Sequence, residues 1–278
     1  MNYFCASFPI DQENNEILIA FLSQHGFEMF EEQTDGLKAF IPAVDVDESE
    51  LRTRFSAIPV EILGREWTIE LLPDQNWNAV WESSFSPVVV AEKISIRAPF
   101  HAAPPPHVMD IIIEPKMSFG TGHHATTALM IEAMLLIDWK GAVVLDMGCG
   151  SGVLAIVAEK SGAESILAID IDDWAVENSQ ENGLRNNCIR ITTLKGNASL
   201  LSGKTFTHIL ANINRNILLH DMHTYVAALE MDGLLFMSGF LTQDREVITE
   251  KARDLGLSPM QSLEHDNWAM LSFKNTRS

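Results

Sequence analysis

The sequence contains few cysteines, few basic residues and no long apolar run, and each shortage excludes a class of protein. Its 278 residues include three cysteines (Cys5, Cys149 and Cys188), an odd number whose spacing matches neither a metal site nor a disulfide framework. No apolar run reaches the ~18 residues needed to cross a bilayer, and the first residues lack the basic-then-apolar pattern of a secretion signal. We therefore expect a globular protein of the reducing cytoplasm that does not associate with membranes.

Basic residues are half as frequent as acidic ones: 19 Lys and Arg stand against 38 Asp and Glu, which gives a net charge of −19. A surface of this charge repels phosphate backbones, so we do not expect direct nucleic-acid binding. The same charge attracts a basic protein, although acidity also serves solubility alone. The composition leaves both of these interpretations open.

The chain is organised around a strand, a glycine-rich turn, a helix and a second strand between Val143 and Asp170. An apolar run of strand length ends at Met147, the sequence Gly-Cys-Gly-Ser-Gly follows at 148–152, and an apolar helix is predicted over 153–160. The second strand ends at Asp170. This order is typical of the first β-α-β unit of a nucleotide-binding site, with glycines where the backbone approaches a ligand and an acid at the tip of the second strand.

The glycine spacing and the charge of this unit favour one kind of ligand. A dinucleotide fingerprint is Gly-x-Gly-x-x-Gly, whereas Gly148, Gly150 and Gly152 are spaced Gly-x-Gly-x-Gly. Asp146, just before the turn, suits a cationic, amine-bearing ligand better than a pyrophosphate. S-adenosylmethionine has no phosphate and carries a sulfonium and an α-ammonium, and Asp170 is placed to accept hydrogen bonds from its ribose hydroxyls. A nicotinamide dehydrogenase and a glycine turn without a ligand stay open as alternatives.

Two further polar positions are candidates for handling the substrate. Asn212 ends the fourth predicted strand of the series (207–212), and ligands of open α/β sheets lie beyond the carboxyl ends of such strands. Asn212 is therefore expected to face the same crevice as Asp170 and to accept a hydrogen bond from an incoming amine, with a turn-forming role as the alternative. One of the adjacent His123 and His124 is expected to shape the substrate entrance, and His123 is a second candidate for positioning the amine. It neighbours His124, but no third ligand stands at a suitable interval, so we predict no metal site.

Three segments are predicted along the chain. Residues 1–72 follow the order β-α-β-β-α-β, the ferredoxin-like split motif, and are expected to form a substrate-recognition domain. Residues 73–86 are expected to be a linker helix with an aromatic stripe that includes Trp77 and Trp81. Residues 87–278 alternate strands and helices, which predicts a Rossmann-like α/β domain with a seven-stranded sheet and one antiparallel edge.

With these residues assembled, the chain resembles a family, the class I S-adenosylmethionine-dependent methyltransferases that modify ribosomal protein L11. The resemblance covers nearly the whole chain, and its most specific part is Phe-Gly-Thr-Gly-His-His-Ala-Thr-Thr at 119–127, followed by Leu-Asp-Met-Gly-Cys-Gly-Ser-Gly at 145–152. It implies S-adenosylmethionine as a consumed methyl donor, and no metal. It also implies a donor site that uses Thr127, Gly148, Asp170 and Asn212, to which the sequence adds Asp146, Gly150 and the loop residues Phe119, Gly120 and Thr121.

The resemblance further implies that residues 1–72 capture ribosomal protein L11, and that methyl groups pass to lysine ε-amines and to the N-terminal α-amine of that protein. Asn212 departs from one motif: Ile213-Asn214-Arg215 follow it where many amino methyltransferases have Pro-Pro-aromatic, so no aromatic is placed there to cradle the amine. A methyltransferase of the same fold for another basic protein or a small molecule is the alternative function, and a non-catalytic binding module is a third. We expect a monomer by default.

Overall fold

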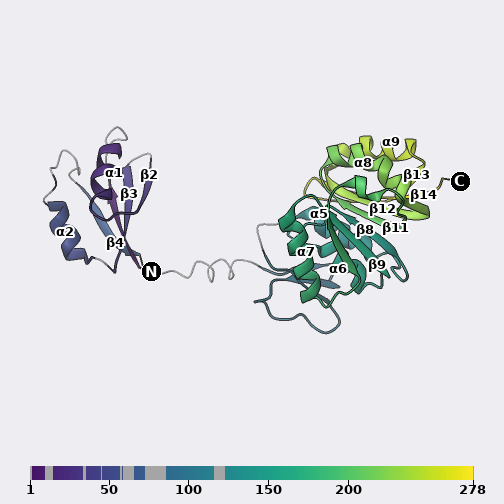
Figure 1. The fold of residues 1–278 in the computed structure, drawn as a ribbon, viewed down its shortest axis with the longest axis horizontal. Helices are drawn as coiled ribbons and strands as arrows, with labels where there is room; N and C mark the ends of the chain where they lie inside the picture. The colour runs from purple at the N-terminus through teal and green to yellow at the C-terminus, as the bar shows by residue number, and fades with distance from the viewer. Residues whose placement is uncertain are drawn as a thin grey trace. The chain divides into compact units, whose positions relative to one another are not determined.

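The structure is a computed structural model that describes residues 2–9, 15–33, 36–44, 46–56, 58, 66–72, 86–115 and 123–277. The chain divides into two compact units, Met1–Phe85 and Ser86–Ser278, which can be followed by colour in Figure 1. The predicted linker helix with Trp77 and Trp81 lies almost wholly outside the described residues. Within the described ranges, no helix is both long enough and apolar enough to cross a bilayer.

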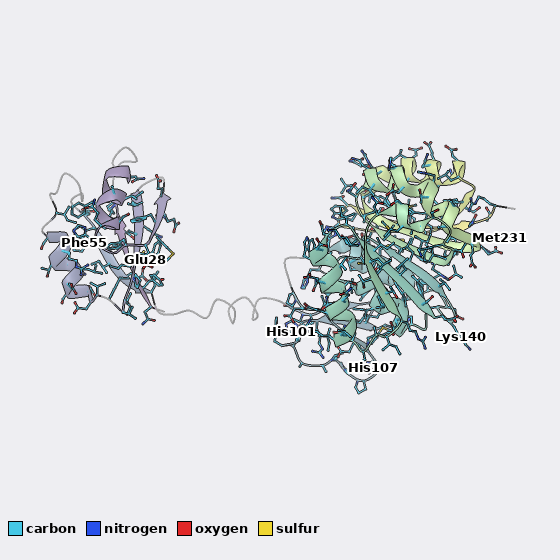
Figure 2. The ribbon with its side chains drawn as sticks, in the orientation of Figure 1. Glu28, Phe55, His101, His107, Lys140 and Met231 are labelled. Atoms are coloured by element: carbon cyan, nitrogen blue, oxygen red, sulfur yellow. The ribbon has the colours of Figure 1, made fainter. Side chains whose placement is uncertain are left out.

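The N-terminal unit contains a four-stranded sheet. Its described elements are β1 (Tyr3–Phe8), α1 (Asn15–Ser23), β2 (Met29–Gln33), β3 (Gly36–Pro42), α2 (Glu48–Ser56) and β4 (Thr68–Leu72). These elements follow one another as the sequence predicts, and the strands pair antiparallel in the order β2-β3-β1-β4. Phe4 and Phe8 of β1 point to one face of the sheet, as alternate strand residues do, and share a buried core with Phe55 of α2. Phe55 is labelled in Figure 2.

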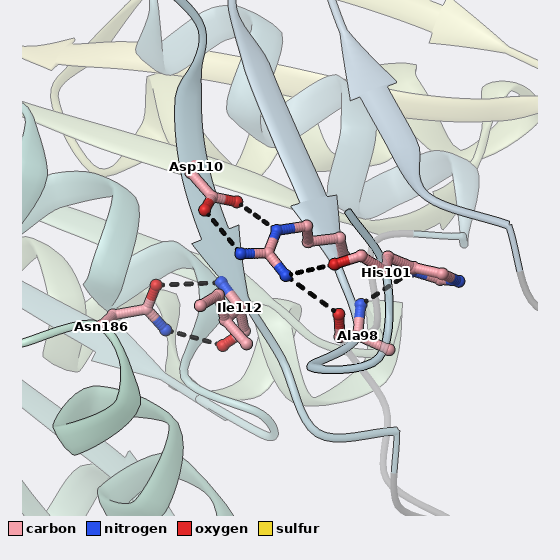
Figure 3. Close-up of polar contacts among 6 residues, drawn as sticks. Ala98, His101, Asp110, Ile112 and Asn186 are labelled. Carbon is pink, nitrogen blue, oxygen red and sulfur yellow. Dashed lines mark hydrogen bonds and ion pairs between the residues drawn. The ribbon is translucent and has the colours of Figure 1, made fainter. Parts of the chain in front are cut away.

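The second unit begins with a small sheet that the sequence does not predict as separate. It consists of β5 (Val88–Val90), β6 (Ile94–Arg97) and β7 (Met109–Ile112), with β6 antiparallel to β5 and parallel to β7. The buried Arg97 joins β6 to β7, because its guanidinium donates to both carboxylate oxygens of Asp110 at 2.8 Å (Figure 3). The same group donates to the carbonyl oxygen of His101 at 2.8 Å. This sheet shares an apolar core with helices α5 (Ala125–Met134) and α6 (Val153–Lys160).

The remaining strands form the predicted seven-stranded sheet. They are β8 (Val143–Met147), β9 (Ser165–Asp170), β10 (Ile191–Lys195), β11 (Phe206–Asn212), β12 (Leu229–Leu241), β13 (Leu257–His265) and β14 (Trp268–Asn275). Besides α5 and α6, this part of the chain contains α7 (Asp173–Arg185), α8 (Arg215–Ala228), α9 (Arg245–Asp254) and the 3-10 helices η2 (Ala198–Leu201) and η3 (Thr242–Asp244). The strand order β10-β9-β8-β11-β12-β14-β13 confirms the predicted Rossmann-like α/β sheet.

Successive residues of a strand enter cores on opposite faces of this sheet. Val144 of β8 lies in the core that contains α5 and α6, and its neighbour Leu145 lies in the core that contains α8 and α9. Figure 1 shows these two helix pairs on opposite sides of the strands. Because both faces are covered, the central strands are apolar almost throughout, which is why they are visible as apolar runs in the sequence.

One strand of the main sheet runs against the others. β14 pairs antiparallel with β12 on one side and with β13 on the other. The sequence predicts an antiparallel edge; the structure instead places the antiparallel strand one position inside, and β13 forms the edge. A two-residue turn joins β13 to β14, with Asp266 and Asn267 at φ values of 48° and 64°, the positive values that a tight hairpin of this length requires.

The direction in which strands are added to the sheet reverses beside β8. From β8 the chain adds β9 and β10 on one side, and it then returns to add β11 and β12 on the other. Open α/β sheets bind ligands in the crevice at such a switch point, beyond the carboxyl ends of the strands. Here the carboxyl ends of β8, β9 and β11 lead to Gly148, Asp170 and Asn212.

Candidate active site

A cavity of about 1840 Å³ lies at the carboxyl ends of β8, β9 and β11. Its lining includes five residues predicted from the sequence, namely Thr127, Gly148, Gly150, Asp170 and Asn212. They are far apart in the chain but meet because β8 pairs with β9 on one side and with β11 on the other. The predicted loop residues 119–121 lie outside the described part of the chain.

The glycine loop between β8 and α6 has a backbone that only glycine adopts easily. Gly148, Gly150 and Gly152 have φ values of +73°, +53° and +77°. A Cβ atom at Gly148 would lie 2.2 Å from Cγ2 of Ile213, so no side chain fits there. The backbone N–H of Gly148 donates to the carbonyl oxygen of Ile169 at 2.8 Å, which holds the loop against the end of β9.

Asp170 links the glycine loop to the start of α7. Its Oδ2 accepts a hydrogen bond from the backbone N–H of Gly150 at 2.9 Å, and its Oδ1 accepts one from the N–H of Asp172 at 3.2 Å. The same carboxylate lines the cavity. Asp170 is therefore held in one orientation at the tip of β9, the position from which the sequence predicts that it binds ribose hydroxyls.

Asp146 lies beneath the loop and is not part of the cavity lining. Its side chain is buried, and its Oδ2 accepts a hydrogen bond from the N–H of Ala155 in the first turn of α6 at 3.1 Å. Burial raises the pKa of Asp146 to about 7, and the nearby charge of Asp170 adds to the effect. Its carboxyl group thus binds the first turn of α6 on the side away from the cavity. Direct contact of Asp146 with a ligand amine stays a prediction.

Asn212 and Thr127 form a polar pair on the wall of the cavity. The side-chain N–H of Asn212 donates to Oγ1 of Thr127 at 3.5 Å, and both residues line the cavity. Oδ1 of Asn212 is buried and accepts no hydrogen bond from any described residue. Because buried amide oxygens in proteins are nearly always paired, this atom suits a ligand that brings an N–H donor.

The adjacent histidines have different surroundings. His124 precedes α5, and its Nδ1 accepts a hydrogen bond from the N–H of Thr126 at 3.3 Å. Its ring packs edge-on against the ring of Trp268, with 4.6 Å between the ring centroids, and both residues line the cavity. Burial lowers the pKa of His124, which favours the neutral form of its imidazole. His123 lies outside the lining, and its Nε2 donates to the carbonyl oxygen of Ser86 at 2.9 Å. In the described ranges, no three His, Cys, Asp or Glu side chains form a metal-binding group.

Besides His124, one of the predicted pair, the cavity has lining residues that no sequence pattern singled out, among them Ile171, Trp174, Asn197 and Ala198. Asn197 follows the end of β10, and its side chain accepts from the N–H of Ser199 to begin η2. The rule that ligands lie beyond strand ends would have identified Asn197, had it been applied to β10 as well as to β9 and β11. Nothing in the local sequence marks Trp174, whose side chain is 47% exposed at the start of α7.

Comparison with known proteins adds independent findings. The sequence matches the family model described as ribosomal protein L11 methyltransferase (PrmA) over residues 6–276. It is 42% identical to the ribosomal protein L11 methyltransferase of Porphyromonas gingivalis over 98% of each chain, and 33% identical to that of Chlorobaculum tepidum over 99% of this chain and 98% of the relative. A crystal structure of ribosomal protein L11 methylase from Lactobacillus delbrueckii subsp. bulgaricus matches with a TM-score of 0.65 and 26% identity, covering 69% of this chain and 100% of that one.

The strand order, the cavity at the switch point and the glycine loop with its acidic partner define a class I methyltransferase of Rossmann-like fold. Within that class, the chain belongs to the ribosomal protein L11 methyltransferase (PrmA) family. The enzymes of this family depend on S-adenosylmethionine as the methyl donor. The resemblance drawn from the glycine unit and the preceding loop is thereby confirmed.

Proposed function

We propose that this protein transfers methyl groups from S-adenosylmethionine to amino groups of ribosomal protein L11, namely lysine ε-amines and the N-terminal α-amine. The names of relatives that align along nearly the whole chain support the substrate. Within the site, the observation that carries the proposal is the buried Oδ1 of Asn212, which has no partner among the described residues and lies on the cavity wall.

The described residues fit the methyl donor. A carboxylate at the tip of the second strand suits two ribose hydroxyls, and Asp170 stands there in the cavity wall. Gly148 and Gly150 both line the cavity, and neither has a side chain that projects into it. Thr127 in the first turn of α5 adds a hydroxyl at a helix N-terminus, where anionic groups such as a carboxylate bind well. When bound, S-adenosylmethionine supplies an electrophilic methyl group.

The task of the chain is to hold a neutral amine in line with that methyl group. We propose that Oδ1 of Asn212 accepts a hydrogen bond from the amine, while its N–H group stays directed to Thr127. A free lysine has a pKa of ~10.4 and is protonated at neutral pH. Desolvation in the cavity lowers that pKa and favours the reactive neutral amine. Positioning of the amine then provides most of the acceleration.

The proposed partner agrees with the charge and the division of the chain. A net charge of −19 attracts a basic protein and repels nucleic acid. The N-terminal unit is compact in its own right, and we propose that residues 1–72 bind the substrate protein, that residues 73–86 link the two units, and that the enzyme acts as a cytoplasmic monomer.

Intact mass spectrometry of ribosomal protein L11 from the same source tests the proposal directly. Incubation with the enzyme and S-adenosylmethionine should produce a ladder of methyl additions, which disappears when the donor is omitted. Asn212→Ala should slow this ladder even when the donor is saturating, because the amide positions the amine. An unchanged mass of L11, with donor binding demonstrated by calorimetry, would leave the assignment as a methyltransferase in place. It would reject L11 as the substrate, in favour of another basic protein or a small molecule.

A further inference from the structure

Helix α7 carries a row of buried asparagines. Asn178, Asn182 and Asn186 are spaced four residues apart, so they share one face of the helix and its C-terminal cap, and their exposed fractions are 0%, 0% and 5%. The core-facing stripe of a surface helix is normally apolar. Buried amides at these positions therefore indicate that their hydrogen bonds have a specific purpose.

Asn186 binds the outer edge of β7. Its Oδ1 accepts from the N–H of Ile112 at 2.9 Å, and its Nδ2 donates to the carbonyl oxygen of Ile112 at 2.7 Å (Figure 3). It satisfies both backbone groups of this residue as a neighbouring strand would. The contact fixes the small sheet to α7 and does not involve the glycine loop.

Asn182, one turn earlier, connects β7 to the glycine loop. Its Oδ1 accepts from the N–H of Glu114, just beyond the end of β7, at 3.0 Å. Its Nδ2 donates to the carbonyl oxygen of Ser151 at 3.0 Å and to Oδ1 of Asn178 at 3.3 Å. Ser151 lies between Gly150 and Gly152, so a single buried amide joins the backbone that follows β7 to the glycine loop.

The neighbouring Ser179 shows how closely α7 approaches the same loop. A Cβ atom at Gly152 would lie 2.4 Å from Oγ of Ser179 and 3.2 Å from its Cα. The loop is thus confined on this side by helix backbone as well as by the amide of Asn182. At the cavity, Asp170 holds the N–H of Gly150, so side chains hold the loop at two peptide groups, Cys149–Gly150 and Ser151–Gly152, with one peptide group between them.

We propose that Asn182 is a positioning residue for the methyl donor. By binding the carbonyl oxygen of Ser151, it fixes the orientation of the Ser151–Gly152 peptide, and with it the backbone of the glycine loop that faces the donor. Three residues of this loop have positive φ and no side chain. The N–H of Gly152 donates to the carbonyl oxygen of Cys149 within the loop at 2.8 Å, and Asn182 holds the carbonyl end of the same Ser151–Gly152 peptide from outside the loop. The inference rests on the proposed function, because it concerns the affinity for S-adenosylmethionine.

Matched substitutions on one helix face test this role. Asn182→Asp keeps the size of the side chain and the acceptor for Glu114 but removes the donor to Ser151. Asn186→Asp removes in the same way the donor to the carbonyl oxygens of Ile112 and Asn182, at a site that does not touch the loop. We expect both to lower the melting temperature, but only Asn182→Asp to weaken S-adenosylmethionine binding in calorimetry, by roughly tenfold or more, as expected for a displaced binding element.

The pH dependence of binding separates positioning from general damage. At acidic pH the carboxyl group introduced at position 182 is protonated, and its O–H can donate a hydrogen bond to Ser151. The affinity of Asn182→Asp for S-adenosylmethionine should therefore recover towards that of wild type. The affinity of Asn186→Asp, which is not expected to fall, should follow that of wild type at every pH. Other ionisable groups lie on the surrounding elements and are present in all three proteins, so their effects on the pH dependence cancel in this comparison. They are Asp110, Glu114, Asp146, Asp170 and Arg185.

Equal losses of affinity in the two variants, or a loss without recovery in acid, would overturn the role of Asn182. If the charged variants do not fold, Asn182→Ala against Asn186→Ala gives the same comparison of affinity against melting temperature. Failure of the wild-type protein to bind S-adenosylmethionine would reject the proposed function instead, before any variant is compared.

Discussion

The carboxylate of Asp170 accepts a hydrogen bond from the backbone N–H of Gly150 at 2.9 Å, and it thereby joins the tip of β9 to the glycine loop. Asp170 therefore has two roles: its carboxylate orders the glycine loop and also lines the cavity. Asp170→Ala should therefore weaken S-adenosylmethionine binding by about 2–4 kcal/mol, the range for losing one or two hydrogen bonds to a charged group. Calorimetry measures this loss directly.

Asp170→Asn serves as the graded control for that experiment. Its amide oxygen still accepts from Gly150, but the charge and the second acceptor are lost, so the affinity should lie between those of wild type and Asp170→Ala. Unchanged affinity in the alanine variant would contradict the assignment of Asp170 to the donor site.

Gly148 and Gly141 offer a matched test of the glycine loop. Both have a φ of +73°, but an added Cβ at Gly141 meets no atom within 4 Å, whereas at Gly148 it lies 2.2 Å from Ile213. Gly141→Ala should cost about 1 kcal/mol of unfolding free energy from backbone strain alone. Gly148→Ala should cost about 1–3 kcal/mol more from overpacking and should lose donor binding. Urea unfolding measures both values, and equal values would show that the contact with Ile213 relaxes without cost.

The buried carboxyl group of Asp146 should make stability depend on pH. Its pKa is raised from 3.8 to about 7, so the folded state retains a proton that the unfolded chain releases. The stabilisation from this proton is complete below the unfolded pKa and is lost as the pH rises towards 7, at up to roughly 1.4 kcal/mol per pH unit. Asp146→Asn keeps a neutral group of the same shape and removes the titration.

The measurement is the difference in melting temperature between wild type and Asp146→Asn across this pH window. Wild type should lose stability relative to the variant as the pH rises from about 4 to about 7, and the difference should then level off. His208, whose pKa is lowered to about 4 by burial, is present in both proteins and cancels. A difference that does not vary with pH would show that Asp146 is already ionised in the folded state at acidic pH.

Two ion pairs of different burial should differ in their contribution to stability. The side chain of Arg97 is 9% exposed and binds Asp110, which is 32% exposed, whereas Lys195 and Asp173 are 55% and 74% exposed. Arg97→Met leaves a half-buried carboxylate unpaired and should destabilise the second unit by about 3 kcal/mol. Lys195→Met should cost at most about 1 kcal/mol, since exposed pairs contribute little. Equal midpoints in urea unfolding would contradict this ranking.

Most of the main sheet could be predicted because its central strands are buried on both faces and therefore apolar. The first and last residues of helices and strands were harder to predict, since hydrogen bonds from side chains elsewhere in the chain determine them. The sequence predicts a strand from Cys188, but β10 begins at Ile191, because the N–H groups of Ile189 and Arg190 donate to the carboxylate of Glu159 on α6. The apolar run Leu234–Met237 predicts a short strand, whereas β12 spans Leu229–Leu241. Asn275 helps to hold its polar beginning by donating to the carbonyl oxygens of Leu229 and Glu230.

Some residues of the candidate site could likewise be predicted from the sequence, and others could not. Gly148, Asp170 and Asn212 could be predicted because each directly follows or ends an apolar strand, and strand ends converge at a switch point. Asn182 could not be predicted, because an asparagine inside a helix gives no sign of whether it is buried or which backbone groups it binds. His124 could not be distinguished from His123 either, since the sequence does not say which of two adjacent rings turns to the cavity.

β14 follows β13 along the chain but lies between β13 and β12 in the sheet. During translation, β13 is therefore made before the strand that will connect it to the rest of the sheet. Until β14 emerges, β12 has an open edge and β13 has no partner strand, a combination that favours pairing with other chains. A released chain truncated at the turn of Asp266 and Asn267 should consequently be prone to aggregation, whereas the full chain closes its own sheet.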